Sequence, residues 1–217
     1  MPIYLQRQID ELKKQILALS AVVEETFHEA IRSLEHTDVS LADTVIARDH
    51  TVNEMEVDLE EECLKILALH QPVAIDLRFI VAVLKINNDL ERISDISANI
   101  AQRTLGLATF NPIPIPFALF DMAEKVESML KKSLDSLVNL DIELARDVCQ
   151  LDDEVDAMHK ENYSLVKNRI RQYPEQLDPL IEYLSVSRHL ERVADLTTNI
   201  AEDILYMIDG EIIRHTY

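Results

Sequence analysis

A twelve-residue segment near the middle of the chain returns almost unchanged in the second half. Leu-Glu-Arg-Ile-Ser-Asp-Ile-Ser-Ala-Asn-Ile-Ala at 90–101 becomes Leu-Glu-Arg-Val-Ala-Asp-Leu-Thr-Thr-Asn-Ile-Ala at 190–201, with seven of the twelve positions identical. A weaker match between 38–49 and 141–152 extends the similarity toward the start of each half. Because self-similarity at a fixed spacing indicates repeated structural units, we expect a chain made of two copies of one fold.

Six long segments, three in each copy, have the apolar spacing of amphipathic helices. The alternating prolines of 111–116 exclude a helix and mark the linker between the copies. Asp38 and Asp141 are suited to cap the second and fifth helices, whereas Pro72 is suited to begin the third and Gly106 to end it. The predicted helices are 4–36, 40–70, 72–106, 117–139, 141–172 and 177–209.

Short connections between long helices make consecutive helices antiparallel neighbours, so each copy is predicted to form a three-helix bundle. The presence of only two glycines in 217 residues argues against sheets joined by tight turns. The predicted fold is therefore all-α, with two tandem antiparallel three-helix bundles at 1–108 and 109–217 that can pack side by side into one elongated body.

The net charge of −19 limits the partners of this chain. Neutralising phosphate groups requires clustered Lys and Arg, so neither nucleic acid nor anionic lipid is an expected partner. The N-terminus lacks the apolar run of a signal peptide, and no stretch of about 18 apolar residues is present, so we expect a cytoplasmic protein without direct membrane insertion. Cys63 and Cys149 occupy non-equivalent positions in the two copies and are expected to stay free thiols.

The repeated motif is predicted to form a helix with two different faces. Apolar residues fall on one side, whereas Glu91 and Asp95, and their copies Glu191 and Asp195, fall on another. Acids four residues apart on a helix repel each other by a few tenths of a kcal/mol, and a bound hard cation relieves that repulsion. The second and fifth helices offer matching positions, so one metal site in each copy could also use Asp49 and Asn53, or Asp152, Asp156 and His159.

Two other interpretations of these acids stay open at this point. In a chain with 40 acidic residues, such pairs also occur on solvated helix faces of a purely structural scaffold. A di-iron bundle enzyme is a second alternative, but it needs paired Glu-x-x-His motifs, and the chain offers only Glu25 with His28. No glycine-rich phosphate loop and no nucleophile elbow is present, so the chain is not expected to be an enzyme.

These motifs together resemble the PhoU family. The resemblance rests on Gln-Pro-Val-Ala-Ile-Asp-Leu-Arg at 71–78, on Glu-Arg-x-x-Asp followed by Asn-Ile-Ala in the first copy, and on the same motif in the second. The chain departs from the family in having Ser94 and Ala194 where Gly usually precedes the motif Asp, and in having Asn53 in place of a carboxylate. The likeness covers essentially the whole chain.

The resemblance implies a regulator of phosphate homeostasis. Proteins of this family repress the phosphate-starvation regulon and limit phosphate uptake through contacts with the ATPase subunit of the phosphate ABC transporter and with a sensor histidine kinase. It also implies metal ions, iron or zinc, on the carboxylate motifs. Arg92 and Arg192 are then expected either to pair with those acids or to contact a partner. Apart from the resemblance, the apolar faces of the long bundles favour a homodimer.

Overall fold

The structure, a computed structural model, describes residues 3–210. Residues 1–2 and 211–217, at the outer ends of the two predicted copies, lie outside this range. The described part is all-α, as predicted, and contains α1 (Ile3–His36), α2 (Val39–His70), α3 (Ile75–Leu107), α4 (Leu119–Asn139), α5 (Ile142–Gln172), the short 3-10 helix η1 (Pro174–Gln176) and α6 (Leu177–Asp209).

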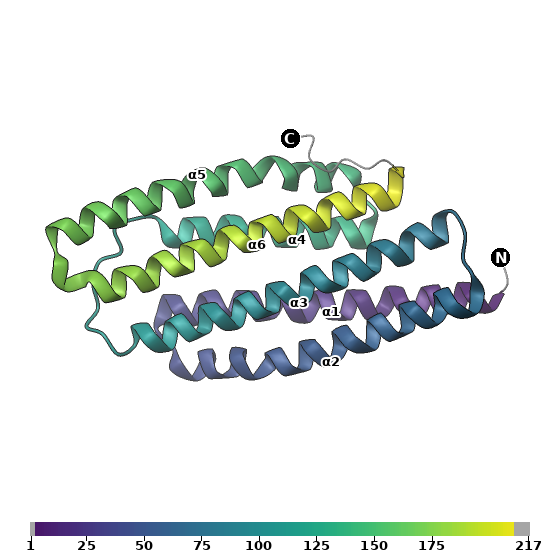
Figure 1. Cartoon of the computed structure of the whole chain (residues 1–217), viewed down its shortest axis with the longest axis horizontal. Helices are drawn as coiled ribbons and strands as arrows, with labels where there is room; N and C mark the ends of the chain where they lie inside the picture. Colours follow the sequence, from purple (N-terminus) through teal and green to yellow (C-terminus); the bar gives the residue numbers. More distant parts are fainter. Residues whose placement is uncertain (1–2, 211–217) are drawn as a thin grey trace.

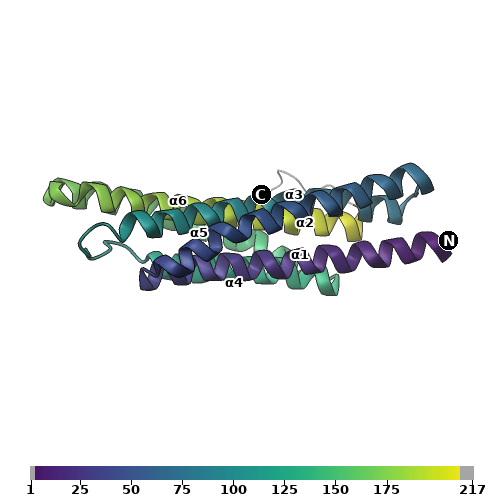
Figure 2. The same cartoon turned by 90° about the horizontal axis from the view of Figure 1, so that it is seen from below.

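The six helices form two three-helix bundles that lie side by side (Figure 1). α1, α2 and α3 pack together, as do α4, α5 and α6, and the two bundles meet along α3 and α6, with α1 beside α4 on the opposite side (Figure 2). Buried apolar residues from all six helices belong to one continuous core. The molecule is therefore elongated, and the two repeated motifs lie on the two helices at the junction between bundles.

Two predicted boundaries of the third helix are wrong. α3 begins at Ile75 rather than at Pro72, because Gln71 and Ala74 adopt positive φ angles of 45° and 50° and break the helical backbone. α3 also continues through Gly106 to Leu107, and the residue that ends it, Ala108, has an ordinary φ of −62°. Gly106 is thus an ordinary helical residue and not a cap.

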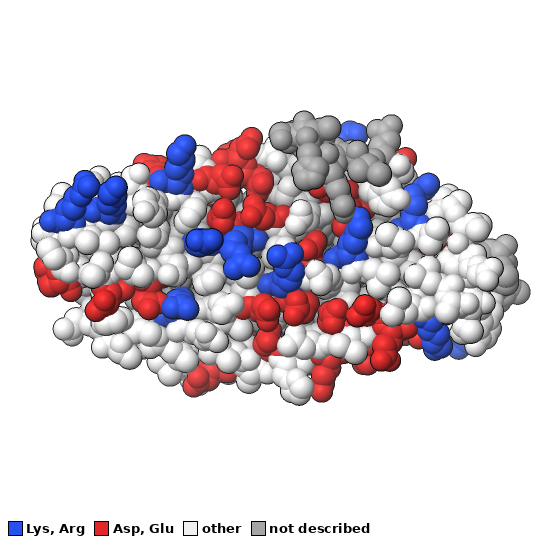
Figure 3. All heavy atoms as spheres, in the orientation of Figure 1, with Lys and Arg blue, Asp and Glu red and all other residues white. Residues whose placement is uncertain are grey.

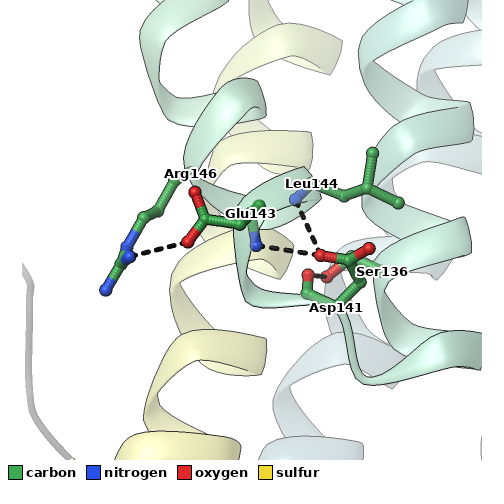
Figure 4. A network of polar contacts seen from close by, with 5 residues as sticks. All are labelled: Ser136, Asp141, Glu143, Leu144 and Arg146. Atoms are coloured by element: carbon green, nitrogen blue, oxygen red, sulfur yellow. Dashed lines mark hydrogen bonds and ion pairs between the residues drawn. The ribbon is translucent and has the colours of Figure 1, made fainter.

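The two predicted aspartate caps are confirmed. The Asp38 carboxylate accepts a hydrogen bond of 3.0 Å from the Leu41 backbone N–H, at the start of α2. At the start of α5 the Asp141 carboxylate accepts from the backbone N–H groups of Glu143 at 3.0 Å and Leu144 at 3.3 Å (Figure 4). These bonds satisfy backbone donors that the first turn of a helix leaves without partners.

Asp141→Ala is expected to lower the free energy of unfolding by about 1 kcal/mol, because the side chain caps two N–H groups of α5. Urea denaturation followed by circular dichroism measures the change. Asp58→Ala is the matched control, because Asp58 is exposed within α2, and it is expected to have a far smaller effect. Equal losses for the two variants would contradict the capping role.

Candidate functional site

The first carboxylate face combines one side of α2 with one side of α3. It consists of Asp49, Asn53 and Glu56 of α2 with Glu91 and Asp95 of α3. Asp49 accepts hydrogen bonds from the Ser94 hydroxyl at 3.0 Å and from the Asn53 amide at 3.4 Å. Partial burial, and then the neighbouring carboxylates of Asp95, Glu56 and Asp49, raise the pKa of Glu91 above its usual value. The predicted residues of this copy therefore do lie together.

The second carboxylate face repeats this arrangement on α5 and α6, with Asp152, Asp156 and His159 beside Glu191 and Asp195. Burial raises the pKa of Asp152 to about 6, with further increases from the carboxylates of Asp195 and Asp156, while the nearby Thr198 hydroxyl acts in the opposite direction. Burial and Asp195 likewise raise the pKa of Glu191. One Asp152 oxygen, Oδ1, is buried, and no described residue lies in hydrogen-bonding geometry to it. Burial therefore disfavours the charged form of Asp152 in particular.

His159 makes the chemistry of the second face different. Its Nδ1 lies 2.9 Å from the Ser187 hydroxyl, which also accepts a 3.0 Å hydrogen bond from Asn162. Burial and the Arg188 guanidinium lower the pKa of His159, against the effect of Asp156. The lowered pKa favours the neutral form of the imidazole, and its Nδ1 is engaged with Ser187. In the first bundle, Glu56 stands in place of His159 and Asn87 in place of Ser187. There the Asn87 side-chain amide donates a 2.9 Å hydrogen bond to the Glu56 backbone carbonyl.

The donor groups of both faces suit a hard cation, because they are mainly carboxylate oxygens. The buried Asp152 oxygen and the raised carboxyl pKa values show that positive charge would be favourable on the second face. Within residues 3–210, however, no three His, Cys, Asp or Glu side chains are placed together so that they could hold a metal ion. Metal binding therefore stays a prediction of the sequence.

The two predicted partner-binding arginines have different surroundings. Arg92 Nη1 lies 3.8 Å from Asp89 Oδ1, so it pairs weakly within its own helix. Arg192 is exposed and forms no ion pair with any described residue, although it lies close enough to Glu191 to lower the pKa of that carboxyl. On the side of the molecule where α3 meets α6, Lys and Arg side chains gather between two strips of acids (Figure 3).

The contacts that join α3 to α6 were not predicted. Lys85 Nζ lies 2.8 Å from Asp203 Oδ1, and Arg103 Nη1 lies 3.1 Å from Glu182 Oε2. Near the second of these pairs, burial and three surrounding arginines, of which Arg103 has the largest effect, lower the pKa of His189 to about 4. Helical periodicity carries no signal for these pairs, because it does not say which helices of the two copies meet.

The other sequence features have structural roles. His28 Nδ1 lies 2.9 Å from Glu127 Oε1 at an exposed contact between α1 and α4, outside the bundle cores where a di-iron enzyme would hold its metal. Cys63 and Cys149 are free, buried thiols, and burial raises their pKa values to about 12 and about 11. Such thiols are poor nucleophiles at neutral pH. No helix of the described part is long and apolar enough to cross a membrane.

Known proteins match this chain over nearly its whole length. The model of the PhoU domain matches it twice, at residues 16–104 and 119–204. The chain belongs to the PhoU family. A PhoU homologue of Clostridium acetobutylicum is 31% identical, over 95% of this chain and 94% of its own, and one of Aquifex aeolicus is 34% identical, over 97% of this chain and 96% of its own. Both are called phosphate-specific transport system accessory proteins.

Solved PhoU structures have the same fold. The crystal structure of PhoU from Pseudomonas aeruginosa aligns with a TM-score of 0.92 and 30% identity, covering 95% of this chain and 99% of that one. The regulatory protein PhoU from Streptococcus pneumoniae aligns with a TM-score of 0.85 and 30% identity, covering 96% and 98%. Proteins of the family are named accessory or regulatory proteins, which confirms the prediction of a non-enzymatic protein.

Proposed function

We propose that this chain is an accessory protein of phosphate transport that represses phosphate uptake and the phosphate-starvation regulon. It acts as an adaptor in the cytoplasm, as a homodimer, between the ATPase subunit of a phosphate ABC transporter and a sensor histidine kinase. The observation that carries the proposal is the full-length similarity to proteins named phosphate-specific transport system accessory proteins. Two long bundles with extended polar faces also provide the surface that an adaptor needs.

In the same proposal the carboxylate faces hold metal ions, iron or zinc. Asp152, Asp156, Glu191 and Asp195 would bind on the second face, where the neutral imidazole of His159 leaves Nε2 as a nitrogen donor. A bound cation supplies positive charge that lowers the repulsion between carboxylates. The first face binds more weakly, because Asn53 donates its amide to Asp49 and replaces a carboxylate.

Replacing Glu91, Asp95, Glu191 and Asp195 together by Ala is expected to abolish repression at high phosphate. All four side chains lie on the two faces and are partly or largely exposed, so the change removes charge while leaving the apolar core in place. Expression of a phosphate-responsive reporter, with the protein level measured by immunoblot, tests the expectation. The matched control replaces the exposed acids Glu54 and Asp58 of α2 by Ala. Repression that persists in the fourfold variant would remove the faces from the mechanism.

A further inference from the structure

The two bundles are offset along their length, and the offset leaves a step. The second bundle stops short of the end at which α1 begins, and its first helix, α4, has 21 residues against 34 for α1 (Figure 1). Two adjoining hollows of about 340 and 120 Å³ lie at this step and share Lys13, Phe79 and Leu140. We call them together the end crevice, which is lined chiefly by Ile9, Lys13, Phe79, Val138, Leu140 and Met207.

Apolar side chains around the end crevice remain in contact with solvent. Ile75 is 68% exposed, and Val138 and Leu140 are each 56% exposed. Leu140 also has a φ of 53°, in the left-handed region that Gly or Asn usually takes after a helix. Adjoining exposed apolar side chains are typical of surfaces that bind another molecule.

Two cations, Lys13 and Arg78, and one carboxylate, Asp76, line the end crevice, so its lining carries a net positive charge, in contrast to the chain as a whole. Lys13 Nζ lies 5.5 Å from the centre of the Phe79 ring, and Arg78 lies against the backbone of Gly210. Among the described residues neither cation forms an ion pair with a carboxylate. The neighbouring Asp76 lies in the first turn of α3, where the helix dipole favours its negative charge. Within residues 3–210, the two cations at the edge of this apolar surface are therefore not paired with a carboxylate.

We propose that the end crevice is the docking site for an amphipathic helix of a partner protein that carries acidic residues beside its apolar stripe. Apolar side chains on successive turns of that helix enter the two hollows, and its carboxylates face Lys13 and Arg78. The inference rests on the proposed function, because an adaptor requires a partner surface. It places that surface away from both carboxylate faces.

The test measures the affinity of the purified chain for each of the two purified candidate partners, the transporter ATPase and the cytoplasmic part of the kinase. Leu140→Glu and Lys13→Glu are each expected to weaken the binding of one of these partners at least tenfold, because they place a negative charge where an apolar residue or a cation meets the acidic helix. Leu64→Glu is the matched control, since Leu64 is a 52% exposed leucine on α2, and it is expected to leave the affinity unchanged. Circular dichroism verifies that the variants are folded.

A photo-crosslinking amino acid in place of Val138 identifies the occupant. A crosslink to an acidic amphipathic helix of the bound partner is the expected result. A crosslink to a second copy of this chain, or to residues 211–217 of the same chain, would overturn the proposal. The proposal would also be overturned if Leu140→Glu bound the partner as tightly as the wild type while the fourfold carboxylate variant did not bind it. In that case the partner binds at the carboxylate faces, and the adaptor role survives. If the wild type binds neither partner, the proposed function itself fails.

Discussion

In metal-free buffer at pH 7, the Asp152→Asn variant is expected to be more stable than the wild type by about 1 kcal/mol. Burial and three neighbouring carboxylates raise the pKa of Asp152 from 3.8 to about 6, so the folded protein disfavours the ionised carboxyl. Without solvent screening, a pKa shift of this size corresponds to roughly 3 kcal/mol of stability. Because the carboxyl is only half-buried, screening by solvent reduces this contribution to about 1 kcal/mol. Asparagine keeps the shape and removes the charge.

The stability difference between Asp152→Asn and the wild type should also depend on pH. A group whose pKa is raised by folding stabilises the fold when it is protonated, and this contribution is lost as pH rises from 3.8 through about 6. The advantage of Asp152→Asn is therefore absent near pH 4, grows between pH 4 and 6 and is complete above pH 6. Thermal denaturation at several pH values measures it. Asp43→Asn, at an exposed acid of α2, is expected to show no such trend.

Added metal should make the wild type more stable than Asp152→Asn, which reverses their order of stability in metal-free buffer. If the second carboxylate face binds iron or zinc, a concentration of 100 times the Kd stabilises the wild type by about 2.7 kcal/mol, whereas Asp152→Asn has lost one ligand and gains less. The wild type then becomes the more stable protein. A wild type whose melting temperature is unaffected by either metal, in titrations that reach millimolar concentration, would refute the metal part of the proposed function.

The local features of this chain could be predicted from its sequence. The six helices and the caps Asp38 and Asp141 follow from short-range rules, and the structure confirms them, apart from the two ends of the third helix. The repeat also predicted that Glu91 and Glu191 lie on equivalent faces, as they do. Gly106 shows the limit of such rules, because a glycine near a helix end ends the helix only if its φ becomes positive, and here the helix continues through it.

Contacts between the two copies could not be predicted in this way. The Lys85–Asp203 and Arg103–Glu182 pairs depend on α3 packing against α6 rather than against another helix. The direction in which His159 points was equally hidden, because it depends on Ser187 of the neighbouring helix. Likewise the end crevice is lined by residues of α1, α3 and α6 and of the end of α4, so it depends on how the two bundles are placed against each other. Each feature depends on the mutual placement of helices, which periodicity within one helix does not specify.

Phe27→Ala is expected to destabilise both halves of the molecule, although Phe27 belongs to the first. The side chain is 1% exposed in α1, and its removal should cost about 4 kcal/mol through lost burial and the cavity left behind. Because the buried residues of all six helices form one continuous core, with α3 packed on α6, the two bundles are expected to unfold in a single transition. The loss in the free energy of unfolding should then be the same whether it is measured in the first bundle or in the second.

Hydrogen exchange of backbone amides provides the measurement. In Phe27→Ala, the most protected amides of α6 should lose as much protection as those of α3, because both exchange only through global unfolding. Phe27→Leu, which keeps most of the volume, should cost less than about 1.5 kcal/mol in both helices. Two calorimetric transitions, with α6 unaffected, would show that the repeats are independent. A single transition means that the shared core couples the carboxylate faces, so a change at one face can alter the stability of the other.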